Sequence, residues 1–238
     1  MGGQRTAEPS MTAGQLTTLA VAGESLLAVG AAAWIRGRAL PAAWAEGSRV
    51  LAVLVGLAAA AVLVAVNLAL LCRAPDVRGV RSVRRLYRDT LRPLFATVRL
   101  RDVVVISVAA GVGEELLFRG ALQAETGLAT ASVVFGLLHI GGRDTVVFGA
   151  WVMVMGAGLG WLAEVTGGLL APIVAHGVYD AVAIAYCRWG PVCRAVRRLD
   201  APDRRDAAAG PGPAARESAP AVRRRPRGRD DPGGRSER

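Results

Sequence analysis

The chain has 238 residues, of which 53% are hydrophobic, and it carries a formal net charge of +10. A soluble domain does not combine such hydrophobicity with such charge, and here the two are segregated, because the arginines cluster between and after long apolar runs. The basic balance alone would allow nucleic-acid binding, but no basic fold interleaved with aromatic residues accompanies it, so we expect no nucleic-acid partner. Arginine clusters beside apolar segments instead set the orientation of membrane proteins.

Six apolar runs follow one another along the chain and predict membrane helices. They cover residues 11–35, 50–72, 103–123, 128–140, 145–163 and 169–187. About 20 apolar residues are needed to cross the hydrocarbon core of a bilayer, so five runs qualify, and the short fourth run can cross only if it is buried among its neighbours. We therefore predict an all-α fold, a polytopic membrane helix bundle of about six transmembrane helices.

Two basic segments lie outside these runs. Residues 73–101 hold nine arginines and predict a basic amphipathic helix on the cytoplasmic surface. Residues 191–238 are rich in Arg, Pro, Ala and Gly and contain too few large apolar residues to fold, so we predict a disordered basic C-terminal tail, either solvated or in contact with anionic lipid. The positive-inside rule places both segments in the cytoplasm. Six crossings with both termini cytoplasmic satisfy this rule, and the exclusive use of arginine with abundant alanine is typical of a GC-rich bacterial genome, which predicts a bacterial plasma membrane.

Two adjacent glutamates, Glu114 and Glu115, interrupt the third apolar run. A charged residue at the membrane centre costs about 2.5–3.5 kcal/mol on insertion scales, so these residues need an explanation. On a helix, Glu115 and Arg119 lie four residues apart and share a face, so they can pair. Glu114 points elsewhere and has no partner in its own helix. A structural ion pair with a second glutamate in a water-filled crevice is the plain alternative to a catalytic role.

The two histidines of the chain both fall within predicted membrane helices. His139 follows Phe135 by four residues, and His176 precedes Asp180 by four, so each pair shares a helical face. Measured from the predicted helix ends at 1.5 Å per residue, Glu114 and the two histidines lie roughly 12–16 Å deep and Asp180 lies roughly 18 Å deep. Three helices thus bring ionisable groups to nearly the same level, which favours a shared site.

The order Glu-Glu-x-x-x-Arg, Phe-x-x-x-His and His-x-x-x-Asp on successive helices resembles the CPBP family. This family includes the CAAX prenyl proteases of the Rce1 type and the bacteriocin-processing and immunity proteins of the Abi group. The resemblance covers about residues 103–187, and three motifs in this order are specific where one alone would be weak. We therefore divide the chain into N-terminal membrane helices with the basic cytoplasmic segment (1–102), a protease core (103–190) and the tail (191–238).

The resemblance implies an intramembrane endopeptidase that hydrolyses a peptide or protein substrate within the lipid membrane. It makes Glu114 the general base, acting with His139 on a water molecule. It places His176 and Asp180 at the positions that stabilise the tetrahedral oxyanion. The supporting residues are Glu115, Arg119 and Phe135, and the pair of Glu115 with Arg119 would brace its helix.

Asp180 departs from the family pattern, because many members carry asparagine at this position. An ionised aspartate cannot donate a hydrogen bond to an oxyanion, so Asp180 would have to be protonated, orient His176, or bind a metal. Two histidines and carboxylates are also a plausible zinc ligand set, which makes Glu114, His139 and His176 candidate metal ligands. The glutamate–histidine mechanism needs no metal, so the sequence leaves two alternatives, no cofactor or zinc.

Two other classes of function compete with the protease. A non-catalytic membrane immunity or scaffolding protein could retain the motif for structure. An ion or proton-coupled transporter would also place glutamates and histidines at mid-membrane, but it would typically carry inverted repeats or broken helices, and we see neither in the sequence. For a protease of bacterial origin, leader-peptide or bacteriocin processing is a better expectation than a prenylated CAAX substrate.

Overall fold

The computed structural model describes residues 11–200, and every regular element within them is a helix. The long helices are α1 (Ala13–Arg38), α2 (Arg49–Cys72), α5 (Leu100–Glu115), α8 (Val146–Thr166) and α9 (Leu170–Trp189). The shorter ones are α3 (Arg78–Leu86), α4 (Arg92–Leu94), α6 (Gln123–Thr126), α7 (Leu128–Leu138) and α10 (Arg194–Arg197). Two π-helical segments, η1 (Tyr87–Leu91) and η2 (Leu116–Leu122), join α3 to α4 and α5 to α6, and two 3-10 turns, η3 (Arg143–Thr145) and η4 (Arg198–Asp200), precede α8 and follow α10. The predicted all-α class is confirmed.

The two N-terminal helices begin at residues whose side chains satisfy free backbone N–H groups. The Thr12 hydroxyl accepts from the backbone N–H of Gln15 at 3.2 Å, and the Gln15 side chain accepts from the backbone N–H of Thr12 at 2.9 Å. At the start of α2, the Ser48 hydroxyl accepts from the backbone N–H of Leu51 at 3.3 Å. Such caps define where each apolar run becomes helical.

Four helices within residues 11–200 are long and apolar enough to cross a membrane. They are α1, α2, α8 with its preceding turn (143–166), and α9. Helix α7 is apolar but has only 11 residues, and the predicted third span is a continuous helical path through α5, η2 and α6 that carries charged residues. A multi-pass membrane protein is supported, whereas the predicted count of six crossings is not confirmed.

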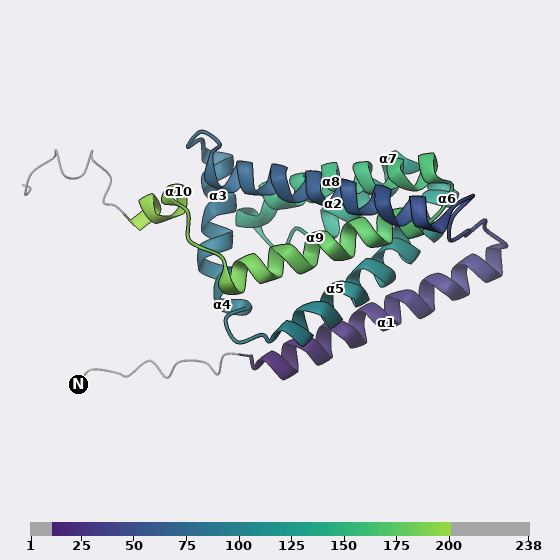
Figure 1. Ribbon diagram of the computed structural model, residues 1–238, viewed down its shortest axis with the longest axis horizontal. Helices are drawn as coiled ribbons and strands as arrows, with labels where there is room; N and C mark the ends of the chain where they lie inside the picture. Colours follow the sequence, from purple (N-terminus) through teal and green to yellow (C-terminus); the bar gives the residue numbers. More distant parts are fainter. Residues whose placement is uncertain (1–10, 201–238) are drawn as a thin grey trace, which may run out of the picture. The chain divides into compact units, whose positions relative to one another are not determined.

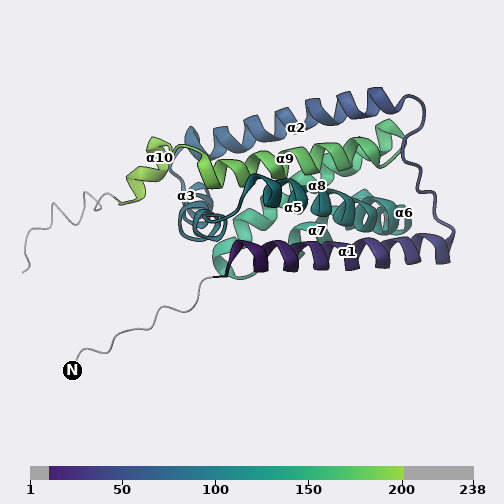
Figure 2. The same ribbon diagram turned by 60° about the horizontal axis from the view of Figure 1, so that its bottom comes forward.

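The long helices pack as a bundle whose central member is α9. Helix α9 contacts α2, α5 and α8, while α1 lies along α5 on one side and α7 lies against α8 on the other. Figures 1 and 2 show α1 and α5 side by side, with α3 and α4 running across one end of the bundle. The site motifs on α5, α7 and α9 therefore face a common interior.

The structure agrees with the helix predicted in the first basic segment but differs from the disorder predicted at the start of the second. The helix expected after residue 73 is present as the run α3–η1–α4. The tail expected to be disordered from residue 191 begins instead with the ordered helix α10, because Val196 is 0% exposed and packs in a cluster with Leu71, Tyr87 and Cys187. The rest of the predicted tail, from residue 201, lies outside the described residues.

Candidate active site

The crossing of α5 and α9 positions the two adjacent glutamates. The helices touch at Gly111 and Gly177, since a Cβ atom on Gly111 would lie 3.0 Å from the backbone nitrogen of Gly177 and 3.0 Å from the carbonyl oxygen of Ile173. Only glycine permits this approach without a shift of one backbone. One helical turn after the crossing, Glu115 points from α5 toward His176 of α9.

A buried polar chain runs from η2 through α5 to α9. One oxygen of Glu115, Oε1, lies 2.8 Å from a guanidinium nitrogen of Arg119 and 2.7 Å from Nδ1 of His176. The Glu115 side chain is 0% exposed and those of Arg119 and His176 are 2% and 5% exposed. Arg119 also donates to the carbonyl oxygen of Gly156 on α8 at 2.9 Å. The predicted pair of Glu115 and Arg119 is present, and it extends to His176, which the sequence did not predict.

Glu114 faces the imidazole rings of both histidines. Its Oε2 lies 3.5 Å from Nε2 of His176, and its Oε1 lies 4.0 Å from Nε2 of His139. The same Nε2 of His176 lies 3.5 Å from Oδ2 of Asp180. The structure thus brings together all four predicted catalytic residues, from α5, α9 and the end of α7.

His139 does not lie inside a membrane helix as expected but at the residue that ends α7, with φ −90° and ψ 3°. Its Nδ1 lies 2.8 Å from the carbonyl oxygen of Phe135. A carbonyl only accepts, so Nδ1 donates this hydrogen bond, and in a neutral ring the lone pair lies on Nε2, the nitrogen that faces Glu114. The hydrogen bond therefore fixes both the tautomer and the direction of this ring.

Phe135 is the aromatic neighbour that the site residues share. Its ring packs edge-on against His139 at a centroid distance of 4.8 Å and against His176 at 6.1 Å. The guanidinium carbon of Arg119 lies 4.7 Å from the centroid of the same ring. The ring is 2% exposed, so it supports all three polar groups and limits the access of water to them.

Glu24 is a carboxylate beside the site that the sequence reading missed. It projects from α1 onto Gly113 of α5, where a Cβ would lie 2.6 Å from Oε2 and 2.6 Å from the carbonyl oxygen of Glu24. The carboxylate interacts electrostatically with His176, Asp180 and Glu114, and its buried Oε2 has no hydrogen-bond partner. A lone acidic residue in an apolar run was the signal that could have revealed it.

The choice between no cofactor and zinc held by Glu114, His139 and His176 stays a prediction. No group of three or more His, Cys, Asp or Glu side chains within the described part of the chain is placed to hold a metal ion. In the arrangement observed, His176 is engaged by Glu115 through Nδ1 while its Nε2 is shared between Glu114 and Asp180.

A cavity of about 270 Å³ extends from Asp180 toward the end of the bundle covered by α3. Its walls are mainly apolar, and they include Phe148 of α8 and Tyr87 of η1. Trp151 and Asn67 also line the cavity, and the indole nitrogen of Trp151 is buried without a hydrogen-bond partner. An apolar cavity with a few polar groups, next to ionisable residues, is typical of a ligand site.

Comparison with known proteins agrees with this geometry. Residues 96–182 match the family model described as type II CAAX prenyl endopeptidase Rce1-like. The chain is also similar to the "Uncharacterized protein YpbD" of Bacillus subtilis (strain 168), with 32% identity over 103 residues, which cover 43% of this chain and 54% of that protein. The chain thus spans about half the length of this curated relative. No solved structure matches the chain.

The family match encloses every charged residue of the site except Glu24. It begins before α5 and ends within α9, so it covers the three motifs from which the resemblance was drawn. The match and the motifs therefore agree, and residues 96–182 of this multi-pass membrane protein are similar to the Rce1-like family.

Proposed function

We propose that this protein is an intramembrane endopeptidase in which Glu114 and His139 activate a water molecule for attack on a peptide bond. The observation that carries the proposal is that histidines from two other elements face the Glu114 carboxylate, His176 at 3.5 Å and His139 at 4.0 Å. A separation of 4.0 Å is longer than a hydrogen bond, so a water that contacts both groups can complete the arrangement.

The first step is attack by this water. Glu114 takes one proton as the water oxygen forms a bond to the carbonyl carbon. The second hydrogen stays on the water oxygen and donates a hydrogen bond to Nε2 of His139, whose Nδ1 donates to Phe135. When the carbon–nitrogen bond of the tetrahedral intermediate breaks, Glu114 returns the proton to the leaving amine. The sequence of steps consumes one water and leaves the protein unchanged.

The second requirement is a donor for the oxyanion, and we assign this role to His176. Both of its ring nitrogens face carboxylate oxygens, so a ring that holds two protons donates Nδ1–H to Glu115 and directs Nε2–H into the site. A preorganised oxyanion donor lowers the free-energy barrier by about 2.7–4 kcal/mol. Arg119 balances the charge of Glu115, and Asp180 orients the ring of His176.

The apolar cavity beside Asp180 indicates a peptide with large apolar side chains next to the scissile bond. One such side chain can occupy the space between Phe148 and Tyr87 while the backbone passes Asp180. The indole N–H of Trp151, which also lines this cavity, can donate to a substrate carbonyl oxygen. Leader-peptide or bacteriocin processing is the narrower form of this proposal.

The test is a cleavage assay in ¹⁸O-labelled water. The purified full chain in a neutral detergent is incubated with a library of synthetic decapeptides that have apolar centres, and the products are identified by mass spectrometry. We expect new C-termini that carry one ¹⁸O atom with the wild type and none with Glu114→Ala at equal amounts of folded protein. Equal products from both proteins, or no products from either, would overturn the proposal. A cellular phenotype that survives Glu114→Ala would favour the non-catalytic immunity or scaffolding alternative.

A further inference from the structure

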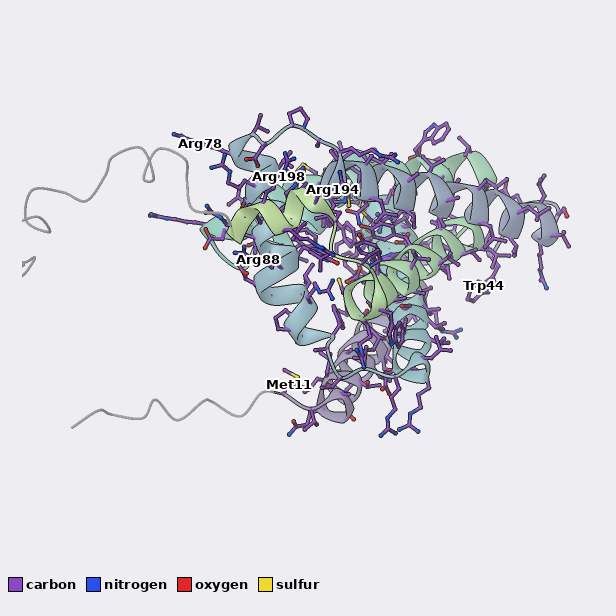
Figure 3. The ribbon with its side chains drawn as sticks, turned by 60° about the vertical axis from the view of Figure 1, so that its left-hand side comes forward. Met11, Trp44, Arg78, Arg88, Arg194 and Arg198 are labelled. Carbon is purple, nitrogen blue, oxygen red and sulfur yellow. The ribbon has the colours of Figure 1, made fainter. Side chains whose placement is uncertain are left out.

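A basic pocket lies at the end of the bundle where α2, α3 and α10 meet, away from the candidate active site. It has a volume of about 450 Å³. Its ionisable lining residues, apart from Cys72, are Arg73, Arg84, Arg194, Arg198 and Asp76. Four positive charges against one negative charge give this lining a net charge of +3. Figure 3 shows Arg194 and Arg198 at the same end of the bundle as Arg78 and Arg88.

Arg84 forms a fixed wall of this arginine pocket. Its side chain is 2% exposed, and its guanidinium group donates to the carbonyl oxygens of Leu71 at 2.8 Å and Ala74 at 2.7 Å. It also contacts the carboxylate of Asp76 at 3.2 Å. These bonds join α3 to the C-terminal end of α2, so the pocket is held by buried contacts and not by surface side chains alone.

Arg194 and Arg198 form the opposite wall. They are four residues apart, so they lie on one face of α10 and η4, while Val196 anchors the other face at 0% exposure. Like charges at this spacing repel each other. Neither side chain forms a hydrogen bond or an ion pair within residues 11–199, and the same is true of Arg73. Three exposed guanidinium groups thus border the pocket, and none of them pairs with a carboxylate of residues 11–199.

The position of the pocket along the bundle indicates what kind of anion can reach these arginines. Helix α2 has 24 residues, about 36 Å at 1.5 Å per residue, which is enough to cross the hydrocarbon core of a bilayer. Arg73 is the residue directly after α2, so the pocket lies at the level where the hydrocarbon ends and the phosphate groups of the lipids begin. Guanidinium groups bind phosphate oxygens in pairs, and basic pockets between membrane helices bind anionic headgroups.

We infer that the arginine pocket formed by Arg73, Arg84, Arg194 and Arg198 binds the phosphate group of an anionic phospholipid headgroup. The lipid links α10 to α2 and α3, which lie more than 100 residues earlier in the sequence. It also relieves the repulsion between Arg194 and Arg198. The site is separate from Glu114 and its neighbours, so it stands whether or not the chain is a protease.

The test measures lipid binding by the full chain in a neutral detergent. Phosphatidylglycerol or phosphatidylcholine is added, and bound lipid is counted by native mass spectrometry while the melting temperature is followed. We expect phosphatidylglycerol to bind and to stabilise the wild type, and Arg194→Gln/Arg198→Gln to weaken this binding about tenfold or more. Arg197→Gln is the matched control, because Arg197 lies on the same helix, donates to the carbonyl oxygen of Val192 and does not line the pocket.

Three binding results would overturn the inference: equal binding of the two lipids, equal binding by the double variant and the wild type, or an equal loss of binding in Arg197→Gln. A fourth concerns stability. If the double variant without lipid already melts lower than the wild type without lipid, by as much as phosphatidylglycerol raises the wild-type melting temperature, the arginines act on stability and not through the lipid. A separate arm adds millimolar inorganic phosphate in place of lipid. Stabilisation by phosphate that equals that by phosphatidylglycerol would show that the pocket binds free phosphate, which contradicts a lipid site.

Discussion

A single carboxylate oxygen of Glu115 lies 2.8 Å from Arg119 and 2.7 Å from Nδ1 of His176. The helical spacing predicts the first contact, whereas the second depends on the crossing of α5 and α9 at Gly111. Because all three side chains are buried, the ion pair and the histidine form one unit. A change in Arg119 should therefore affect both the stability of the protein and the position of His176.

Arg119→Met tests the stabilising part of this unit. It removes the guanidinium group that balances Glu115 and that donates to Gly156 on α8. Breaking a buried pair by removing one partner costs about 3–5 kcal/mol, so we expect a marked decrease in the melting temperature of the purified protein. Arg38→Gln, which breaks the exposed contact with Glu125, should melt like the wild type. Equal melting of all three proteins would contradict a stabilising role of Arg119.

Glu24→Gln tests whether the carboxylate of α1 belongs to the site. Its buried Oε2 has no hydrogen-bond partner, and a charged carboxylate at such a position costs more stability than a neutral amide of the same shape. The glutamine variant should therefore have a higher melting temperature than the wild type. In a chain of this size, an increase of about 1 kcal/mol in the free energy of unfolding raises the melting temperature by about 2–4 °C. If the negative charge of Glu24 also stabilises a protonated His176, the cleavage rate should fall in the variant while the Michaelis constant stays near its wild-type value. A wild-type rate would place Glu24 outside the site.

Asp180→Asn and Asp180→Ala together test the role of Asp180. Its Oδ2 lies 3.5 Å from Nε2 of His176, and the amide of asparagine keeps an oxygen at this position. We expect Asp180→Asn to retain most of the cleavage activity and Asp180→Ala to lose about 10²-fold, the effect of disturbing one oxyanion donor. The measurement is the initial rate on one peptide from the library. Equal losses in the two variants would show that the negative charge itself is needed.

A chelation experiment tests the choice between no cofactor and zinc. The mechanism proposed for Glu114, His139 and His176 uses their own protons and a water, so cleavage should persist after incubation with a chelator. Metal analysis of the purified protein should then give far less than one metal ion per chain. Loss of activity on chelation with recovery on addition of zinc would contradict this mechanism, and the two histidines would then be reassigned as ligands.

Most of the helical framework follows from the sequence. Apolar runs that need to avoid water predict α1, α2, α8 and α9 to within a few residues, because the backbone of a membrane segment must satisfy its own hydrogen bonds. The crossing count does not follow, since α7 is short and the path through α5 carries Glu114, Glu115 and Arg119. The ordered start of the tail was missed because Val196 lies in a short segment rich in arginine, and its burial depends on tertiary contacts.

The sequence predicts which residues form the candidate site, but it does not predict all the contacts between them. Similar depth along three helices predicts that Glu114 lies close to His139 and His176, and the structure places both histidines within 4.0 Å of its carboxylate. How far each helix is rotated depends on packing, so the contact of Glu115 with His176 could not be read from spacing. The same holds for Glu24, which reaches the site only because Gly113 lets α1 approach α5.

The most direct test of the account compares the cleavage rates of the wild type, Glu114→Gln and Glu125→Gln at equal concentrations of folded protein. Glu114→Gln keeps the shape of the side chain but removes the base, while Glu125 lies on α6 and contacts Arg38. Loss of a general base reduces the rate about 10²–10⁴-fold. We predict a loss of this size for Glu114→Gln and a wild-type rate for Glu125→Gln. A Glu114→Gln rate equal to that of the wild type would contradict the proposal that Glu114 activates water for peptide hydrolysis.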